Sequence, residues 1–167
     1  MKNYLLIFVC LCISACVMDK YTWKDTENKR SSSNSCYEAS IEPIHLYNAS
    51  KNGYSSFKLR LQNKTDKDIV INWDKTLYID AGGTKGLFVD QAMLDSKQVK
   101  LPDTVFPKGS YTQEIFPAAC IIYSEGPYGW AYFHDYMPEG EKGVILSVTC
   151  DWKEVKEKMT VKLINNY

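Results

Sequence analysis

Residues 144–150 read VILSVTC, and this stretch decides the fold class. Every second residue from Val144 onward is apolar, as expected for a strand that packs one face on a core. A turn over residues 151–154 leads into a second alternating stretch, so the two form a hairpin. Because the polar Glu157 interrupts its apolar face, we expect the second strand to contact the core only after this residue. The apolar members of that face are Val155, Met159, Val161 and Leu163.

The same two-residue period recurs through the middle of the chain. Residues 55–63 alternate apolar and polar side chains, and the turn over residues 63–68 is rich in residues that bond their own backbone. One face of the next strand then carries the apolar side chains Ile69, Ile71 and Trp73. Further extended stretches are expected at residues 77–80, 86–89, 111–116 and 118–123.

These stretches predict an all-β fold. No window has a convincing helical period, although residues 89–96 have room for one or two helical turns. Short strands at spacings near ten residues are typical of two antiparallel sheets packed face to face. We therefore predict an antiparallel Ig-like β-sandwich of about 7–9 strands. "Ig-like" describes the architecture alone, because the cysteine and tryptophan signature of true immunoglobulin domains is not clear.

The first fifteen residues have the order of a secretory signal. Lys2 precedes an apolar run at residues 4–13, and small residues follow it. A helix that crosses a bilayer needs roughly 20 apolar residues, so this run is too short to be a membrane span. We exclude residues 1–15 from the fold as a signal peptide.

The residues Ile13-Ser14-Ala15-Cys16 resemble the lipobox of bacterial lipoproteins. The resemblance implies cleavage before Cys16, a diacylglyceryl group on its thiol, and attachment to a membrane surface in the bacterial cell envelope. Two or three acyl chains hold a protein firmly, whereas one binds only marginally. Val17 stands where inner-membrane retention usually uses aspartate, so the resemblance favours the outer membrane. The alternative is an ordinary secretory signal whose small residues precede a cysteine.

The mature chain divides into two parts. Residues 16–35 are polar and serine-rich and are expected to be the lipidated N-terminus and a flexible tether. Residues 36–167 have the length of one domain, the β-sandwich. The sequences NKTDKD, IVINW, LYID and PEGEKG within residues 55 to 163 resemble small bacterial or phage-borne lipoproteins with a single β-sandwich. This resemblance implies no particular activity.

Three cysteines, Cys36, Cys120 and Cys150, remain after the signal and Cys16 are set aside. In an oxidising compartment an odd number implies at most one internal disulfide and one leftover thiol. The sequence leaves the pairing open, with Cys36 favoured as one partner. The chain has twenty basic and twenty acidic residues, so nothing in its charge attracts nucleic acid.

Catalytic signals are weak. The histidines are His45 and His134, but no local device such as a Gly-x-Ser-x-Gly turn accompanies them. A cysteine nucleophile would need an activating base that the sequence does not show. We therefore expect no enzyme and interpret His134 as an ordinary loop or strand residue. Its conceivable partners are Ser124, Asp135, Ser147 and Asp151.

Metal and cofactor signals are also weak. The acidic loops around Asp66 and Asp68 and around Glu139 and Glu141 lack the order of a calcium loop, and no paired cysteines or histidines have zinc spacing. The glycines at residues 82–86 lack the spacing of a phosphate-binding loop. We expect solvated turns, no metal and no cofactor.

The most distinctive stretch is YSEGPYGWAYFHDYM at residues 123–137. In an extended chain, Phe133 and Met137 would face the core, and the opposite face would display the four candidate binding residues Tyr128, Trp130, Tyr132 and Tyr136. Exposed aromatic side chains of this kind dominate binding hot spots. We interpret this face as a contact surface for a protein or a glycan. The alternatives are that Trp130 and Tyr132 belong to the core, or that the tyrosines only pack along a sheet.

The sequence thus favours a membrane-anchored envelope lipoprotein that acts as a binding module for another envelope protein. One alternative is a small envelope enzyme that uses His134 or a free cysteine. The other is a purely structural accessory lipoprotein. Loss of binding without loss of folding would separate the first class from the last.

Overall fold

The computed structural model describes residues 29–48, 51–89, 100–126 and 129–164. This part of the chain is all-β, with one short 3-10 helix, η2. Its elements are β1 (Ser31–Ser33), β2 (Tyr37–Asn48), β3 (Lys51–Asn63), β4 (Ile69–Ile71), β5 (Leu77–Asp80), β6 (Gly83–Val89), β7 (Asp103–Val105), β8 (Ser110–Pro117), η2 (Ala118–Cys120), β9 (Ile121–Gly126), β10 (Gly129–His134), β11 (Gly140–Cys150) and β12 (Lys153–Leu163). The twelve strands exceed the predicted 7–9 because β1 and β7, with only three residues each, are too short to show a period, and because β2 was not recognised in the sequence.

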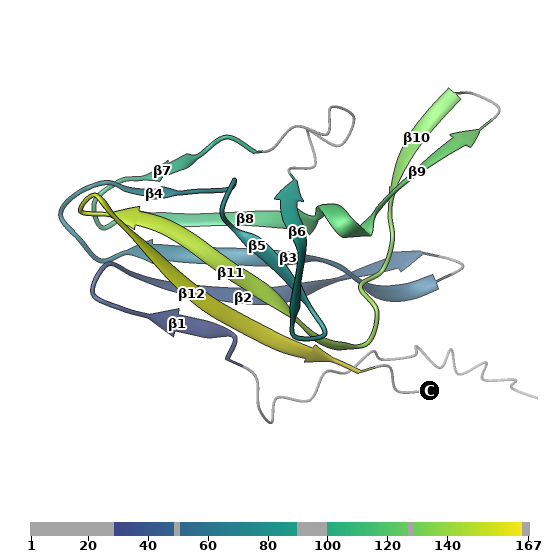
Figure 1. The fold of residues 1–167 in the computed structure, drawn as a ribbon, viewed down its shortest axis with the longest axis horizontal. Coiled ribbons are helices and arrows are strands. Elements are labelled where there is room, and N and C mark those ends of the chain that lie inside the picture. The colour runs from purple at the N-terminus through teal and green to yellow at the C-terminus, as the bar shows by residue number, and fades with distance from the viewer. Residues whose placement is uncertain (1–28, 49–50, 90–99, 127–128, 165–167) are drawn as a thin grey trace, which may run out of the picture.

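Ten of the strands form one antiparallel sheet in the order β1-β2-β3-β8-β6-β5-β11-β4-β7, with β12 on β11. The link between β6 and β8 is only two residue pairs long. On one side of this link lie β1, β2, β3 and β8, and on the other side the remaining strands, with β11 and β12 crossing in front of β2 and β3 (Figure 1). Both parts contribute side chains to a single buried core, for example Leu59 from β3 and Leu146 from β11. The all-β antiparallel prediction is therefore confirmed.

The predicted C-terminal hairpin is also confirmed. β11 and β12 pair from Gly140↔Leu163 to Cys150↔Lys153. On β12 the fully buried apolar residues begin at Met159, after Glu157, as the interrupted face predicted. The strand thus starts at the surface and enters the core halfway along its length.

β1 lies within the segment that the sequence assigned to the tether. It pairs with β2, and the Ser32 hydroxyl donates a 2.6 Å hydrogen bond to the Glu157 carboxylate of β12. The backbone N–H of Thr160 donates to the Lys29 carbonyl at 2.9 Å. β1 therefore lies between β2 and β12 and brings two edges of the sheet together. A run of serines has no apolar period, so this strand could not be predicted from the sequence.

The contact between β1 and β12 depends on pH through Glu157. The Ser32 hydroxyl, then Asn34 and Lys29, hold the pKa of the Glu157 carboxyl below its usual value, against an opposing effect of burial. A lowered folded-state pKa stabilises the protein above the ordinary glutamate pKa, and this contribution is lost as the pH falls through the folded-state value. We expect Glu157→Gln to cost about 1 kcal/mol at pH 7 and progressively less as the pH falls below the ordinary glutamate pKa. Urea unfolding of both proteins across this range measures the difference; parallel pH profiles would contradict it.

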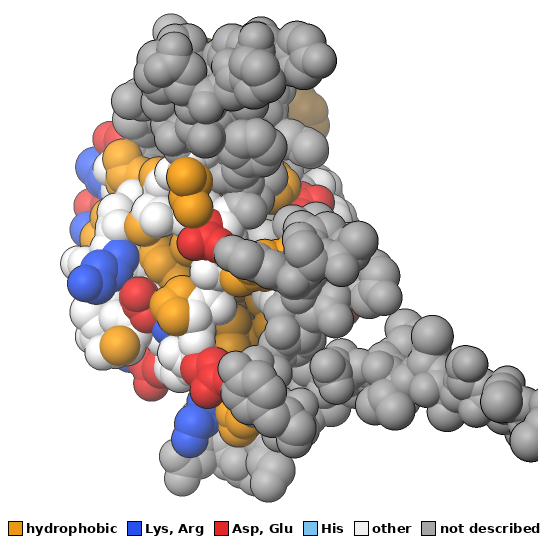
Figure 2. Space-filling model, turned by 90° about the vertical axis from the view of Figure 1, so that its right-hand side faces the viewer, with side chains coloured by type: hydrophobic (Ala, Val, Ile, Leu, Met, Phe, Trp, Pro, Cys, Tyr) orange, Lys and Arg blue, Asp and Glu red, His pale blue; other side chains and the backbone are white. Residues whose placement is uncertain are grey.

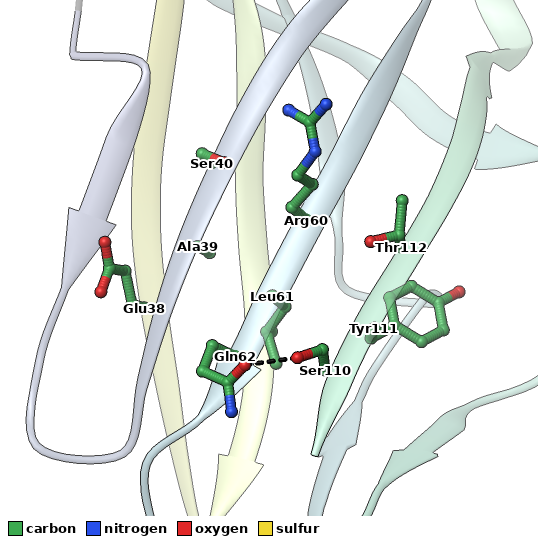
Figure 3. A pocket seen from close by; sticks show the side chains of 9 residues that line it. All are labelled: Glu38, Ala39, Ser40, Arg60, Leu61, Gln62, Ser110, Tyr111 and Thr112. Atoms are coloured by element: carbon green, nitrogen blue, oxygen red, sulfur yellow. Dashed lines mark hydrogen bonds between the residues drawn. The ribbon is translucent and has the colours of Figure 1, made fainter. Parts of the chain in front are cut away.

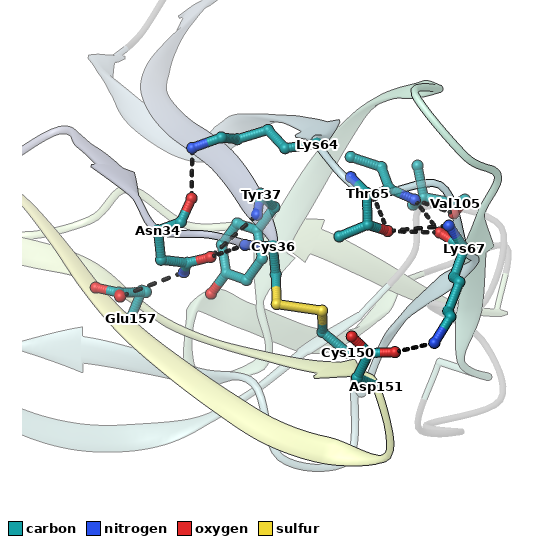
Figure 4. Close-up of a disulfide and its surroundings, with 11 residues drawn as sticks. Asn34, Cys36, Tyr37, Lys64, Thr65, Lys67, Val105, Cys150, Asp151 and Glu157 are labelled. Atoms are coloured by element: carbon teal, nitrogen blue, oxygen red, sulfur yellow. Dashed lines mark hydrogen bonds and ion pairs between the residues drawn. A yellow bond between two sulfur atoms is a disulfide. The ribbon is translucent and has the colours of Figure 1, made fainter.

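A disulfide ties the start of β2 to the end of β11 (Figure 4). It joins Cys36 to Cys150, which confirms the expectation that Cys36 is a partner, and leaves Cys120 as a buried free thiol. Asn34 shapes the turn before it, since its side-chain oxygen accepts from the N–H groups of Cys36 at 2.8 Å and Tyr37 at 3.0 Å. The β1–β2 turn is thus fixed covalently and by hydrogen bonds.

The loop between β3 and β4 is held at the same end of the molecule. Asn63 is fully buried, and its side-chain nitrogen donates to the carbonyls of Lys67 at 2.7 Å and of Val105 and Phe106 at 3.0 Å. Its side-chain oxygen accepts from the backbone and hydroxyl of Thr65 at 2.9 Å. The predicted turn over residues 63–68 is confirmed, with Asn63 as the residue that organises it.

Candidate functional site

The aromatic stretch forms an arm that projects from the body. β9 and β10 pair only with each other in the described chain, and Figure 1 shows this hairpin at the end away from the β11–β12 turn. Trp130 pairs with Glu125 and Tyr132 with Tyr123, so the two aromatic positions share one face of the hairpin. An isolated two-stranded hairpin is only marginally stable in water. The fold therefore presents these two positions on a hairpin whose ladder is separate from the main sheet of the described chain.

The base of the arm is attached to two other elements. The N–H of Asp135 donates to the Cys120 carbonyl, and the N–H of Met137 donates to the Tyr54 carbonyl of β3, both at 2.7 Å. Met137 is buried in the core, as predicted. From the end of the molecule that carries the arm, hydrophobic side chains lie among acidic ones over the part of the surface that is described (Figure 2).

The four candidate binding residues have different positions. Tyr128 lies outside the described residues. Trp130 and Tyr132 lie in β10, and Tyr136 follows it in the segment that returns to the body. Tyr136 is half-buried, and its ring packs against Gly53 of β3 so closely that a Cβ atom at Gly53 would overlap it. Its position suits an anchor for the arm, whereas Trp130 and Tyr132 lie farther out along the hairpin.

Gly53 is therefore expected to tolerate no side chain. Gly53→Ala must displace the Tyr136 ring or the β3 backbone, and such overpacking costs about 1–3 kcal/mol. Gly83→Ala is the matched control, because a Cβ there would meet only the Asp80 carbonyl at 3.8 Å, an ordinary contact. Urea unfolding of both variants tests the prediction. Equal stabilities for the two variants would show that Tyr136 does not hold the arm.

Three of the groups considered for catalysis, Cys120, Ser147 and Asp151, are engaged elsewhere or are protonated, whereas the side chains of His134 and Ser124 lie outside the described part. Burial raises the pKa of the Cys120 thiol to about 11, so it is not a thiolate at neutral pH. The Ser147 hydroxyl donates to Glu154 at 2.7 Å, and the Asp151 carboxylate accepts from Lys67 at 2.7 Å. The backbone places His134 at the end of β10.

A shallow groove on the outer face of β2, β3 and β8 is a second candidate (Figure 3). It has a volume of about 290 Å³ and is lined by Glu38, Ala39, Ser40, Arg60, Leu61, Gln62, Ser110, Tyr111 and Thr112. Its longest polar side chains already have partners: Arg60 pairs with Glu42 at 2.9 Å, and the Ser110 hydroxyl donates to Gln62. The groove is therefore best described as the solvated face of the sheet.

A buried polar cluster surrounds Lys100. Its ammonium lies 4.4 Å from the centre of the Trp73 ring and 2.8 Å from the Asp103 carboxylate, which also accepts from the Trp73 indole N–H at 2.8 Å and the Tyr111 hydroxyl at 2.6 Å. Burial would raise the pKa of Asp103, but these donors outweigh it and lower the value. Lysine, ring and carboxylate satisfy one another, so this cluster joins β7 to β8 instead of offering a site.

The acidic loops are exposed at Asp66, Asp68, Glu139 and Glu141. In the described ranges no three metal-ligating side chains gather. Nor does any helix within those ranges have the length and apolar character to cross a membrane.

Comparison with protein-family models, curated proteins and solved structures finds no match for this chain. One exposed residue that the sequence reasoning passed over is Trp152 in the β11–β12 turn, with 97 % of its surface exposed. A tryptophan within a polar turn was the signal that could have identified it.

Proposed function

We propose that this protein is a membrane-anchored envelope lipoprotein whose β9–β10 arm binds another envelope protein. The observation that carries the proposal is the separate two-stranded sheet, which places Trp130 and Tyr132 at alternate positions of a projecting hairpin. Aromatic side chains lose little entropy when they become ordered at an interface. The exposed edges of a hairpin can also pair with a strand of a partner.

The proposed anchor is the lipid on Cys16, supported by the lipobox-like residues before it. Confinement to the membrane raises the effective concentration of the arm near its partner, so a weak contact suffices. The outer membrane is the proposed location, and an Ig-like sandwich is the proposed architecture of the body, supported by two parts of the sheet that share one core. Globomycin-sensitive processing and a fatty-acyl mass on Cys16 test the anchor; cleavage elsewhere without acyl mass refutes it.

The enzymatic alternative has less support, because the one free thiol in the described chain is buried and protonated at neutral pH. A structural accessory without a discrete site is the other alternative. It predicts that changes in the arm alter nothing unless they unfold the domain.

The test is crosslinking in intact envelopes at native expression, followed by mass spectrometry. The variant Trp130→Ala/Tyr132→Ala is compared with Phe106→Ala, which removes an aromatic ring that is 69 % exposed in the β7–β8 turn. One dominant partner, lost in the double variant and kept in Phe106→Ala at unchanged melting temperatures, supports the proposal. A partner retained by the double variant, or none enriched by the native protein, would overturn it.

A further inference from the structure

The turn between β11 and β12 holds two residues in a strained backbone conformation. Asp151 and Trp152 both have positive φ angles, 47° and 65°. Two-residue hairpin turns of this kind favour Asn-Gly, and a bulky side chain with positive φ is a rare outlier. Because Trp152 is 97 % exposed, its indole also gains almost nothing from burial. A strained, exposed tryptophan directs attention to a function outside folding.

Beside Trp152 lies a recess of about 330 Å³. Val70 and Thr149, which pair across β4 and β11, line it from the strands. Their strand neighbours Ile71 and Val148 are buried in the core, so this pair faces outward. The remaining lining residues come from two loops: Lys67, Asp68, Asp151 and Trp152.

The two loops that flank the recess are held in place. Lys67 and Asp151 join them by a 2.7 Å ion pair. The disulfide at Cys150 immediately precedes the turn (Figure 4). The buried side chain of Asn63 donates to the Lys67 carbonyl at 2.7 Å and so fixes the backbone there. The recess is therefore formed before any ligand arrives, which lowers the entropic cost of binding.

The lining has the chemistry that recognises a sugar ring. The face of an indole is electron-rich and attracts the electron-poor C–H groups on one face of a pyranose. The exposed Asp68 carboxylate has no partner among the described residues and can accept from sugar hydroxyls. Thr149 also lines the recess, and its hydroxyl already accepts a 3.0 Å hydrogen bond from the Asn72 side chain. Lys67 against Asp68 and Asp151 leaves one net negative charge, which disfavours acidic sugars.

We propose that this recess binds a neutral sugar residue of a glycan, stacked on the indole of Trp152. The site lies at the opposite end of the molecule from the β9–β10 arm (Figure 1), so it goes beyond the protein partner proposed above and does not depend on it. A protein with both sites would contact a glycan at one end and a protein at the other.

The test probes the purified full-length chain with an array of neutral and acidic oligosaccharides, followed by calorimetric titration with the best neutral binder. Trp152→Gly should weaken binding by about tenfold or more, because the stacking surface is lost. The same variant should raise the melting temperature by a few degrees, because glycine adopts positive φ without strain. Trp152→Tyr should retain most of the affinity.

Phe106→Ser is the matched control, since it removes an exposed aromatic ring at the same end but outside the lining of the recess. It should bind like the native protein. No binding on the array, equal binding by Trp152→Gly, or preference for acidic oligosaccharides would overturn the proposal. Trp152-dependent binding to phosphatidylglycerol vesicles without any glycan would also overturn it and assign the turn to a lipid surface. None of these results bears on the Trp130 and Tyr132 crosslinks.

Discussion

Replacing Cys36 and Cys150 together by alanine is expected to lower the free energy of unfolding by about 2–5 kcal/mol. The bridge spans a sequence separation of 114 residues, so it joins nearly the whole described domain into one covalent loop. In the chain-entropy model a loop of this length restricts the unfolded chain by about 4.7 kcal/mol. Urea unfolding of the native and double-alanine proteins under oxidising conditions measures the effect.

The reducing agent dithiothreitol provides the control for this prediction. It should destabilise the native protein and leave the Cys36→Ala/Cys150→Ala variant unchanged. Cys120→Ala should keep the sensitivity to reduction, because its buried thiol takes no part in the bridge. Peptide mapping should find Cys36 linked to Cys150, and Cys120 alkylated only after unfolding. A native protein that unfolds identically with and without reductant would contradict the prediction.

Local periodicity was enough to predict most of the long strands, although the twelve-residue β2 was missed. Residues 55–63 and 144–150 alternate because one face of each strand lies in the core, and Leu59, Leu61, Val144 and Val148 are indeed buried. β1 was missed because its three residues are all serines, which show no alternation of apolar and polar side chains. The partner of Ser32, the Glu157 carboxylate, lies 125 residues away, a contact that no local pattern encodes.

The candidate sites, too, could be predicted only where they depend on local sequence. The sequence drew attention to the aromatic stretch but could not show that β9 and β10 pair only with each other, since pairing depends on the other strands. It placed Tyr136 on the binding face, whereas the close approach to Gly53 requires the β3 backbone to pass beneath the ring. The recess beside Trp152 needs β4 next to β11, a neighbourhood set by the whole sheet.

Lys142 is another residue whose environment depends on strand pairing. The sequence placed it in a loop before the last hairpin, but it lies in β11 opposite Asp80 of β5, with a fully buried side chain. Its ammonium pairs with the Asp80 carboxylate and donates to the Glu139 carbonyl at 3.1 Å. A buried charge without its partner is costly, because neither water nor a counter-ion replaces the lost interaction.

The two members of this pair should not be equally sensitive to mutation. Asp80→Ala leaves the ammonium buried with one carbonyl, and we expect a loss of about 3–5 kcal/mol in the free energy of unfolding. Lys142→Met removes the buried charge and leaves a carboxylate whose side chain is 23 % exposed and can be hydrated, so we expect a loss below about 2 kcal/mol. Urea unfolding at pH 7 measures both.

The double variant decides whether the buried charge itself causes the asymmetry. Once Lys142→Met has removed the ammonium, Asp80→Ala no longer strands a charge, so adding it should cost less than about 1 kcal/mol. The double variant should therefore be more stable than Asp80→Ala alone, an unusual result for a protein with two core-flanking substitutions. If the losses in unfolding free energy of the two single variants instead add up in the double variant, the ion pair is no stronger than one on the surface. The buried charge of Lys142 would then not be the cause of the asymmetry.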